Sequence, residues 1–211
     1  MPRYGLIDRD YGLRLRSTAY DGDGRIYMLN LAKFLPGSDP LAGSDRLSGG
    51  RSHDAADYAP IPLLTAVGAT LRLVSDVVAS SGDWDRATVV DYPTRRSFLE
   101  LAERRDFREW HMYKQVAVER TTVVGMLPAG DLPTDAAGGR ILLELWHGRT
   151  PLPLAAGPAT LFDVEGTVIG DGRNWTGARY TPIETGTPLP LLRPRSDYQA
   201  LLLEPRILRW R

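Results

Sequence analysis

The order of strand-like and helix-like segments in the first 130 residues constrains the fold more than any other feature of this sequence. Each strand-like segment is short and apolar, and most are bounded by Gly, Pro, Ser or Asp. The predicted elements are a strand at 26–34, a short helix at 58–67, strands at 70–78 and 86–92, a helical region that begins near Thr94, and a strand at 120–126. This β-α-β-β-α-β order is typical of a split βαβ unit, the ferredoxin-like arrangement. We therefore predict an α+β fold.

The rest of the chain differs in composition and in its pattern of predicted elements, which predicts a second structural unit. Residues 128–139 have the composition of a linker, because Pro, Gly, Ala and Asp follow one another without periodicity. Beyond them the predicted strands are 141–146, 160–169 and 175–183. The apolar run at 198–203 is left without an assignment as strand or helix. The expected organisation is a ferredoxin-like domain over residues 1–130 and a small β-rich extension over 140–211 that packs on it.

Composition excludes several functional classes. The chain has no cysteine, which rules out disulfides, thiolate metal sites and thiol nucleophiles. Its 26 basic and 26 acidic residues are interspersed, so we expect no nucleic-acid partner, which would need a concentrated basic patch. No run approaches the roughly 20 apolar residues of a membrane span, and the N-terminus lacks an apolar leader. We therefore expect a cytoplasmic protein without a membrane partner, and the lack of phosphate-binding glycine patterns predicts no nucleotide cofactor.

A run around the third strand resembles a known family. Residues 84–98, WDRATVVDYPTRRSF, are similar to the "WD…YPSR..F" run of DUF1330-like proteins in the dimeric α/β-barrel superfamily, and residues 26–34 look like the first strand of that group. The resemblance covers about residues 20–128. It implies that two four-stranded sheets face each other, typically from two chains, so a homodimer is expected. The alternative is that the C-terminal extension covers the open face within one chain.

The helical region before the 120–126 strand carries the best candidate for catalysis. Residues that keep helical spacing there are Phe107, Trp110, His111, Lys114 and Val118. This spacing predicts that the imidazole of His111 points inward, where it would act as a general acid or base near neutral pH. The alternative is a hydrogen-bonded structural histidine. Lys114 shares the face, where it would hold an anionic intermediate or extend past the core into water.

Polar and aromatic residues on the strands complete the predicted site. Asn30 lies within an apolar strand and Asp91 near the end of another, and each needs a hydrogen-bond partner if it is buried. We predict that both orient a substrate; alternatively, Asp91 caps the following helix or pairs with an arginine. Tyr27, Tyr58 and Trp110 are candidates for the wall of a substrate pocket, although aromatic residues near sheet ends are usually core.

A second and weaker constellation lies in the C-terminal part. Asp163 and Glu165 alternate with apolar residues and therefore share one face of a strand. Paired carboxylates can share a proton or bind Mg²⁺ or Ca²⁺, although the solvated face of an edge strand gives the same pattern. The three histidines show no metal-ligand spacing, so no resident metal is predicted. Lys33 and Lys114 are the only lysines, which gives both slight additional interest.

Three functional hypotheses remain open. The first is an enzyme that acts on a small apolar, aromatic or polyketide-like metabolite without a nucleotide cofactor, as an oxygenase, isomerase or cyclase in which His111 moves the proton. The second is a non-catalytic ligand-binding or assembly protein, which the lack of a strong catalytic motif favours. Heme binding is a third hypothesis. A pocket beside His111 would favour an enzyme or ligand binder, and a filled barrel would favour a structural role.

Overall fold

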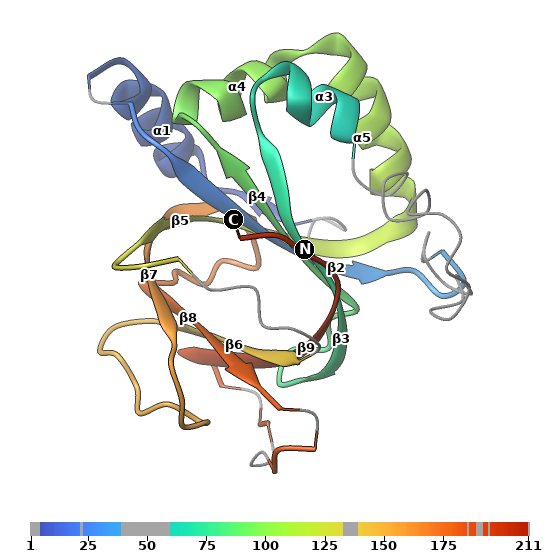
Figure 1. Cartoon of the computed structure of the whole chain (residues 1–211). Helices are drawn as coiled ribbons and strands as arrows, with labels where there is room; N and C mark the ends of the chain where they lie inside the picture. The colour runs from blue at the N-terminus through green and yellow to red at the C-terminus, as the bar shows by residue number, and fades with distance from the viewer. Residues whose placement is uncertain are drawn as a thin grey trace.

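Eight antiparallel strands form a closed barrel, and the helices lie together on one side of it (Figure 1). This computed structural model describes residues 5–21, 23–38, 60–132, 139–184, 186–188, 192–193 and 195–210. The strands are β1 (Leu6–Ile7), β2 (Ile26–Phe34), β3 (Thr70–Ser80), β4 (Arg86–Tyr92), β5 (Val118–Pro128), β6 (Arg140–Trp146), β7 (Thr160–Gly170), β8 (Gly177–Ile183) and β9 (Tyr198–Leu208). The helices are α1 (Arg9–Asp21), α3 (Ile61–Ala66), α4 (Arg95–Glu103) and α5 (Arg105–Ala117). The protein is therefore mostly β, with a few short helices.

The strand order of the barrel is β7-β5-β2-β4-β3-β9-β6-β8, and the pairing of β8 with β7 completes the ring. Neighbouring strands are antiparallel throughout. The short strand β1 pairs with the far end of β7, beyond the stretch that β8 occupies.

The predicted ferredoxin-like dimeric α/β barrel, an α+β fold, is wrong. The strands β5, β2, β4 and β3 lie side by side close to the predicted positions, but their sheet does not end there. β3 pairs with β9 and β5 pairs with β7, so both edges continue into strands of the C-terminal part. Ring closure removes the unpaired edges and covers the second face of the sheet within one chain. The expected homodimer loses this supporting argument and stays a prediction.

Large apolar side chains occupy the interior of the barrel. They come from alternate positions of the barrel strands, as the twofold periodicity of a strand requires. Four aromatic residues of this core form a cluster in which neighbouring ring centroids are 5.3 to 6.2 Å apart: Tyr27, Phe162, Tyr180 and Trp210. The inside of the barrel is therefore a hydrophobic core.

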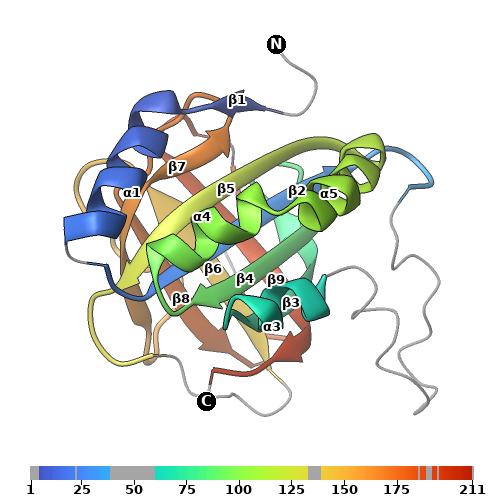
Figure 2. The same cartoon turned by 90° about the horizontal axis from the view of Figure 1, so that it is seen from above.

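A second core lies between the helices and the outer face of the barrel. Helix α3 contacts β3, α4 contacts β4, α5 contacts β5, and α1 contacts both α4 and β7. Figure 2 shows α4 and α5 running across the sheet, with α3 beside them and α1 over β7. No helix within the described ranges is long and apolar enough to cross a membrane.

Helix α1 is an element that the sequence analysis did not predict. Asp8 caps its first turn, because its carboxylate accepts a hydrogen bond of 2.8 Å from the backbone N–H of Tyr11. Tyr11 and Leu15 lie one turn apart and are buried. The side chain of Tyr11 packs directly on Gly125 and Gly166, where an added Cβ would clash with the Tyr11 hydroxyl and the Tyr11 ring, respectively. These two glycines allow the helix to approach the barrel closely.

A loop rather than a helix covers part of the outer face of the barrel at β6 and β8. The fully buried Glu144 accepts hydrogen bonds from Arg179 (3.1 Å) and from the hydroxyl of Tyr198 (2.6 Å). Arg179 also donates to the carbonyl of Pro151 in the loop (2.8 Å) and lies over the ring of Trp146. The opposite charges of Glu144 and Arg179 neutralise each other, and both side chains are hydrogen-bonded, as burial of an ion pair requires.

Candidate functional site

A pocket of about 270 Å³ lies between α3, α4 and α5 and the outer face of the barrel. Its volume is just below the range typical of sites for drug-sized ligands, so it suits a small molecule. The lining residues are Met28, Asn30, Pro60, Leu64, Leu71, Thr88, Val90, Tyr92, Phe98, Leu101, Ala102, Phe107, Arg108, Trp110, His111, Val123, Val168 and Ile169. The pocket is thus enclosed mainly by aromatic and aliphatic side chains.

Aromatic rings form much of the wall. Tyr92 at the end of β4 meets Phe98 of α4 edge to face, with ring centroids 5.3 Å apart. On α5, Phe107 and Trp110 pack together at 5.7 Å. Burial raises the pKa of Tyr92 above its ordinary value, so its phenol stays neutral at physiological pH. Such a wall favours a flat apolar ligand, because aromatic groups gain from edge and offset contacts.

His111 lines this pocket, as the helical spacing predicted. Its ring stacks on Phe107 with centroids 5.8 Å apart and planes inclined by 26°, and the residue is partly buried. An imidazole in this position is held in place on one face. Imidazole groups serve as general acids or bases near neutral pH, and this one lies in the wall of the pocket.

The floor of the pocket carries a polar pair. Asn30 on β2 lies directly opposite Thr88 on β4 in the strand register, and both residues line the pocket. One N–H of the Asn30 amide donates to the carbonyl of Met28 at 3.3 Å. The amide and the hydroxyl retain further donor and acceptor capacity. They can therefore fix an oxygen of a bound molecule, as was predicted for Asn30.

The structure separates Asp91 and Tyr27 from this pocket. Strand alternation turns both toward the other face of the sheet, and Tyr27 belongs to the core inside the barrel. Asp91 is buried and accepts hydrogen bonds from Arg72 (2.6 and 3.0 Å) and Arg25 (3.0 Å). The surroundings of Asp91 thus match the alternative interpretation, in which this carboxylate pairs with arginine.

Two other predicted pocket residues lie outside the part of the chain that the structure describes. These are Tyr58 and the side chain of Lys114. Their predicted contribution to substrate binding stays a prediction. Trp110, by contrast, lines the pocket as predicted.

Asp163 and Glu165 differ in their surroundings. Asp163 is exposed, whereas Glu165 is partly buried and binds the guanidinium of Arg95 through both oxygens. The hydroxyl of Tyr11 also donates to Glu165 at 3.2 Å, and burial together with this carboxylate raises the pKa of Tyr11. Among the described residues, no group of three or more histidine or acidic side chains could hold a metal ion. Glu165 therefore serves to tie β7 to α1 and α4.

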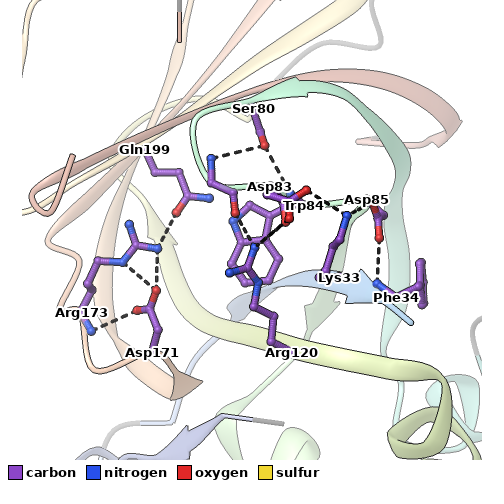
Figure 3. A network of polar contacts seen from close by, with 11 residues as sticks. Lys33, Phe34, Ser80, Asp83, Trp84, Asp85, Arg120, Asp171, Arg173 and Gln199 are labelled. Atoms are coloured by element: carbon purple, nitrogen blue, oxygen red, sulfur yellow. Dashed lines mark hydrogen bonds and ion pairs between the residues drawn. The ribbon is translucent and has the colours of Figure 1, made fainter. Parts of the chain in front are cut away.

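Lys33 belongs to a network at one end of the barrel (Figure 3). Its ammonium donates to Asp83 (2.9 Å) and Asp85 (3.0 Å), and these bonds raise the pKa of Lys33. Asp85 also accepts from the backbone N–H of Phe34 at 2.8 Å. Lys33 thus fastens the turn between β3 and β4 to β2.

Two arginines, each of which lies over a tryptophan ring, extend the same network (Figure 3). Arg120 lies 4.8 Å over the ring of Trp84 and donates to the carbonyls of Gly82 and Asp83. Arg173 binds Asp171 and Gln199, which connects the turn after β7 to β9. These contacts join turns and strands at the end of the barrel, so we interpret the network as structural.

Sequence reasoning missed several residues of the pocket. Phe107 was recognised only as part of the helical stripe, and Thr88 is a strand position that alternation could have placed beside Asn30. Arg108 follows Phe107 directly and lies at the margin of the stripe. A pattern of apolar residues alone does not reveal such a basic residue, because it resembles any solvent-exposed arginine.

Comparisons with known proteins add little to this picture. No family model matches the chain, and no curated protein matches it. The chain is similar to the crystal structure of RPA0582, a protein of unknown function from Rhodopseudomonas palustris, with a TM-score of 0.44 and 22% identity over 60% of this chain and 99% of that one. The methylated form of RPA0582 gives a TM-score of 0.43 and 22% identity over 63% and 98%. The resemblance to DUF1330-like proteins is contradicted, because the chain forms a closed eight-stranded barrel.

Proposed function

We propose that this protein binds a small apolar or aromatic metabolite between its helices and its barrel, and that His111 moves a proton on that molecule. The observation that carries the proposal is the pocket of about 270 Å³, in which His111 shares an aromatic wall with Phe107 and Trp110. The polar pair Asn30 and Thr88 on the floor supports it, since a few polar groups in an apolar pocket orient a ligand.

The chemistry that fits this arrangement is proton transfer at carbon. A ring nitrogen of His111 would accept a proton from a carbon next to a carbonyl group, and the C–H electron pair would move into the carbonyl to give an enolate. Hydrogen bonds from Asn30 and Thr88 would stabilise the charge that develops on oxygen. The same step begins an isomerisation, a cyclisation or a cofactor-independent oxygenation.

The alternative is a non-catalytic ligand-binding or assembly protein. The packed interior of the barrel favours it, because the largest element of the fold serves as core and not as a cavity. The stacking of His111 on Phe107 is also compatible with a purely structural histidine. In this case ligands would bind in the pocket and remain unchanged.

Hydrogen exchange on phenylpyruvate tests the catalytic proposal. This aromatic ketone has an acidic methylene group between ring and carbonyl, and NMR in D₂O follows replacement of its hydrogens. We expect hydrogen exchange to be faster with the protein than in buffer alone. In the variant His111→Gln the exchange rate should fall by about 100-fold or more, since general acid–base catalysis typically accelerates a reaction by about 10²–10⁴-fold. The matched control is His147→Gln, because His147 is exposed after β6 and outside the pocket.

A second pair of variants separates binding from catalysis. Ala102→Trp enlarges an exposed residue that lines the pocket and should block it, whereas Ala66→Trp makes the same change on α3 away from the lining. If phenylpyruvate binds and Ala102→Trp prevents binding while exchange stays at the buffer rate, the non-catalytic alternative is correct. If His111→Gln unfolds the protein, the histidine is structural.

A further inference from the structure

We propose that Arg108 makes the rim of this pocket a carboxylate site, so that the ligand is a small aromatic acid. The inference rests on the proposed function, since it names the class of molecule that the same pocket takes. Arg108 lies on α5 one residue after Phe107, it lines the pocket, and it is exposed. Its guanidinium is therefore at the boundary between the apolar wall and solvent.

The charges around the pocket are unbalanced. Its ionisable lining residues include two basic groups, Arg108 and His111, and among the described lining residues there is no aspartate or glutamate. The neighbouring arginines Arg104 and Arg105 differ from Arg108, because each of them has a carboxylate partner. Arg104 binds Asp106 and Arg105 binds Glu109, whereas within the described part of the chain no carboxylate pairs with Arg108.

An anionic ligand would supply the missing charge. An arginine can bind a carboxylate through two parallel hydrogen bonds, and this pairing is stronger beside apolar walls than in open water. The exposed position matters as well, because a carboxylate at the rim keeps part of its hydration and avoids the cost of full burial. The ring of the ligand would then lie against Phe107 and Trp110.

The position of Arg108 also fixes which atom His111 can reach. The two residues are three apart on one helix, and side chains at this spacing are neighbours with Cβ atoms about 5–6 Å apart. A ligand whose carboxylate is held by Arg108 would therefore bring the atoms close to that carboxylate toward His111. The substrate class is thus an aromatic acid with an acidic proton near its carboxyl group.

Calorimetric titration with a charged ligand and its uncharged isostere tests the anion site. The probes are 2-naphthoate and 2-naphthamide, which share the ring system and differ in charge. We expect 2-naphthoate to bind the wild type at least about tenfold more tightly, as a charge-assisted pair would give. Arg108→Gln should abolish this difference, and Arg105→Gln, which removes the same charge from the same helix, should preserve it.

The outcomes separate the two proposals. If both probes bind equally and Arg108→Gln behaves as Arg105→Gln does, the carboxylate site is refuted while the pocket stands. If Ala102→Trp leaves the binding of both probes unchanged, or if neither probe binds, the pocket itself is refuted together with the proposed function. Loss of 2-naphthoate binding in Arg108→Gln with retention of 2-naphthamide binding supports the inference.

Discussion

The two faces of the same strands have different surroundings in this protein: one faces the packed interior of the barrel, and the other faces the helices. On β2, Tyr27 and Leu29 point into the barrel and are completely buried, while Met28 and Asn30 point outward and line the pocket. The interior is enclosed on all sides by a continuous ring of strands. The outer face at these strands is covered by α3, α4 and α5, which leave about 270 Å³ between them and the sheet.

This difference suggests how the fold divides stability from function. A ring of eight strands has just enough interior for side chains to fill it, so the inside becomes core. The helical layer is built from short separate segments, and imperfect coverage there creates room for a ligand. The interior should therefore be intolerant of truncation, and the helical wall of the pocket should tolerate it.

The largest expected effect is that of Phe162→Ala. Phe162 is 1% exposed and contacts the rings of Tyr27, Tyr180 and Trp210 inside the barrel. Its truncation should lower the free energy of unfolding by about 3–5 kcal/mol, because the closed ring cannot collapse onto the cavity. Urea denaturation followed by circular dichroism measures the change.

The matched variant is Phe107→Ala in the wall of the pocket. Phe107 is only partly buried and already borders empty space, so we expect a loss of about 1 kcal/mol, close to the typical effect of a point mutation. Equal losses for the two phenylalanines would contradict the division between a packed interior and a tolerant outer layer.

A smaller but still large effect is expected at the loop-covered part of the outer face. Glu144→Gln removes the charge that neutralises the buried Arg179, and it should destabilise the protein by about 3 kcal/mol. The double variant Glu144→Gln with Arg179→Met should recover part of this loss, since it removes the uncompensated ion. Thermal unfolding at several pH values compares the variants, and absence of recovery would argue against a charge effect.

A modest effect is expected for His111→Ala. The residue is partly buried and its ring stacks on Phe107, so the free energy of unfolding should fall by about 1 kcal/mol, close to the typical effect of a point mutation. Chemical denaturation gives this value independently of any activity. A loss comparable to that of Phe162→Ala would place the histidine in the core of the fold and remove it as a catalytic candidate.

The smallest effect concerns the end of the barrel. Burial alone would raise the pKa of Asp171, but hydrogen bonds and charge from Arg173 hold it below the ordinary value. The pair therefore contributes stability above the pKa of unfolded aspartate, about 3.9, and the contribution is lost as the pH falls through the lower folded pKa. Because the carboxylate is about one-third exposed, Asp171→Asn should cost only about 0.5 kcal/mol at pH 7. The difference should shrink in denaturation series as the pH falls below the pKa of unfolded aspartate, and a difference that stays constant with pH would exclude this linkage.

Local patterns predicted much of the secondary structure. The strand at 26–34 and the strand at 86–92 have the predicted bounds, and the helical stripe that carries His111 turns this residue to the pocket. Those features depend on neighbouring residues, whose periodicity is visible in the sequence. Asn30 was identified for the same reason, as a polar residue in an apolar strand.

Long-range pairing explains what the sequence did not reveal. The closing strand β9 covers Tyr198–Leu208, yet its apolar run was left unassigned, and nothing in it indicates that Leu208 pairs with Leu73. The four-strand order also occurs in a ferredoxin-like sheet, so the local patterns fit both folds. Asp91 was placed in the site because a buried carboxylate is notable, whereas its arginine partners are Arg72 of β3 and Arg25, which directly precedes β2.

The pairing of β3 with β9 has a consequence for how the chain acquires its structure. Contacts between residues so distant in sequence raise the contact order, which slows folding. While the chain emerges from the ribosome, the edge of β3 stays unprotected until β9 has been synthesised. Growing chains of this protein should therefore depend on chaperones during that interval, because exposed sheet edges promote aggregation.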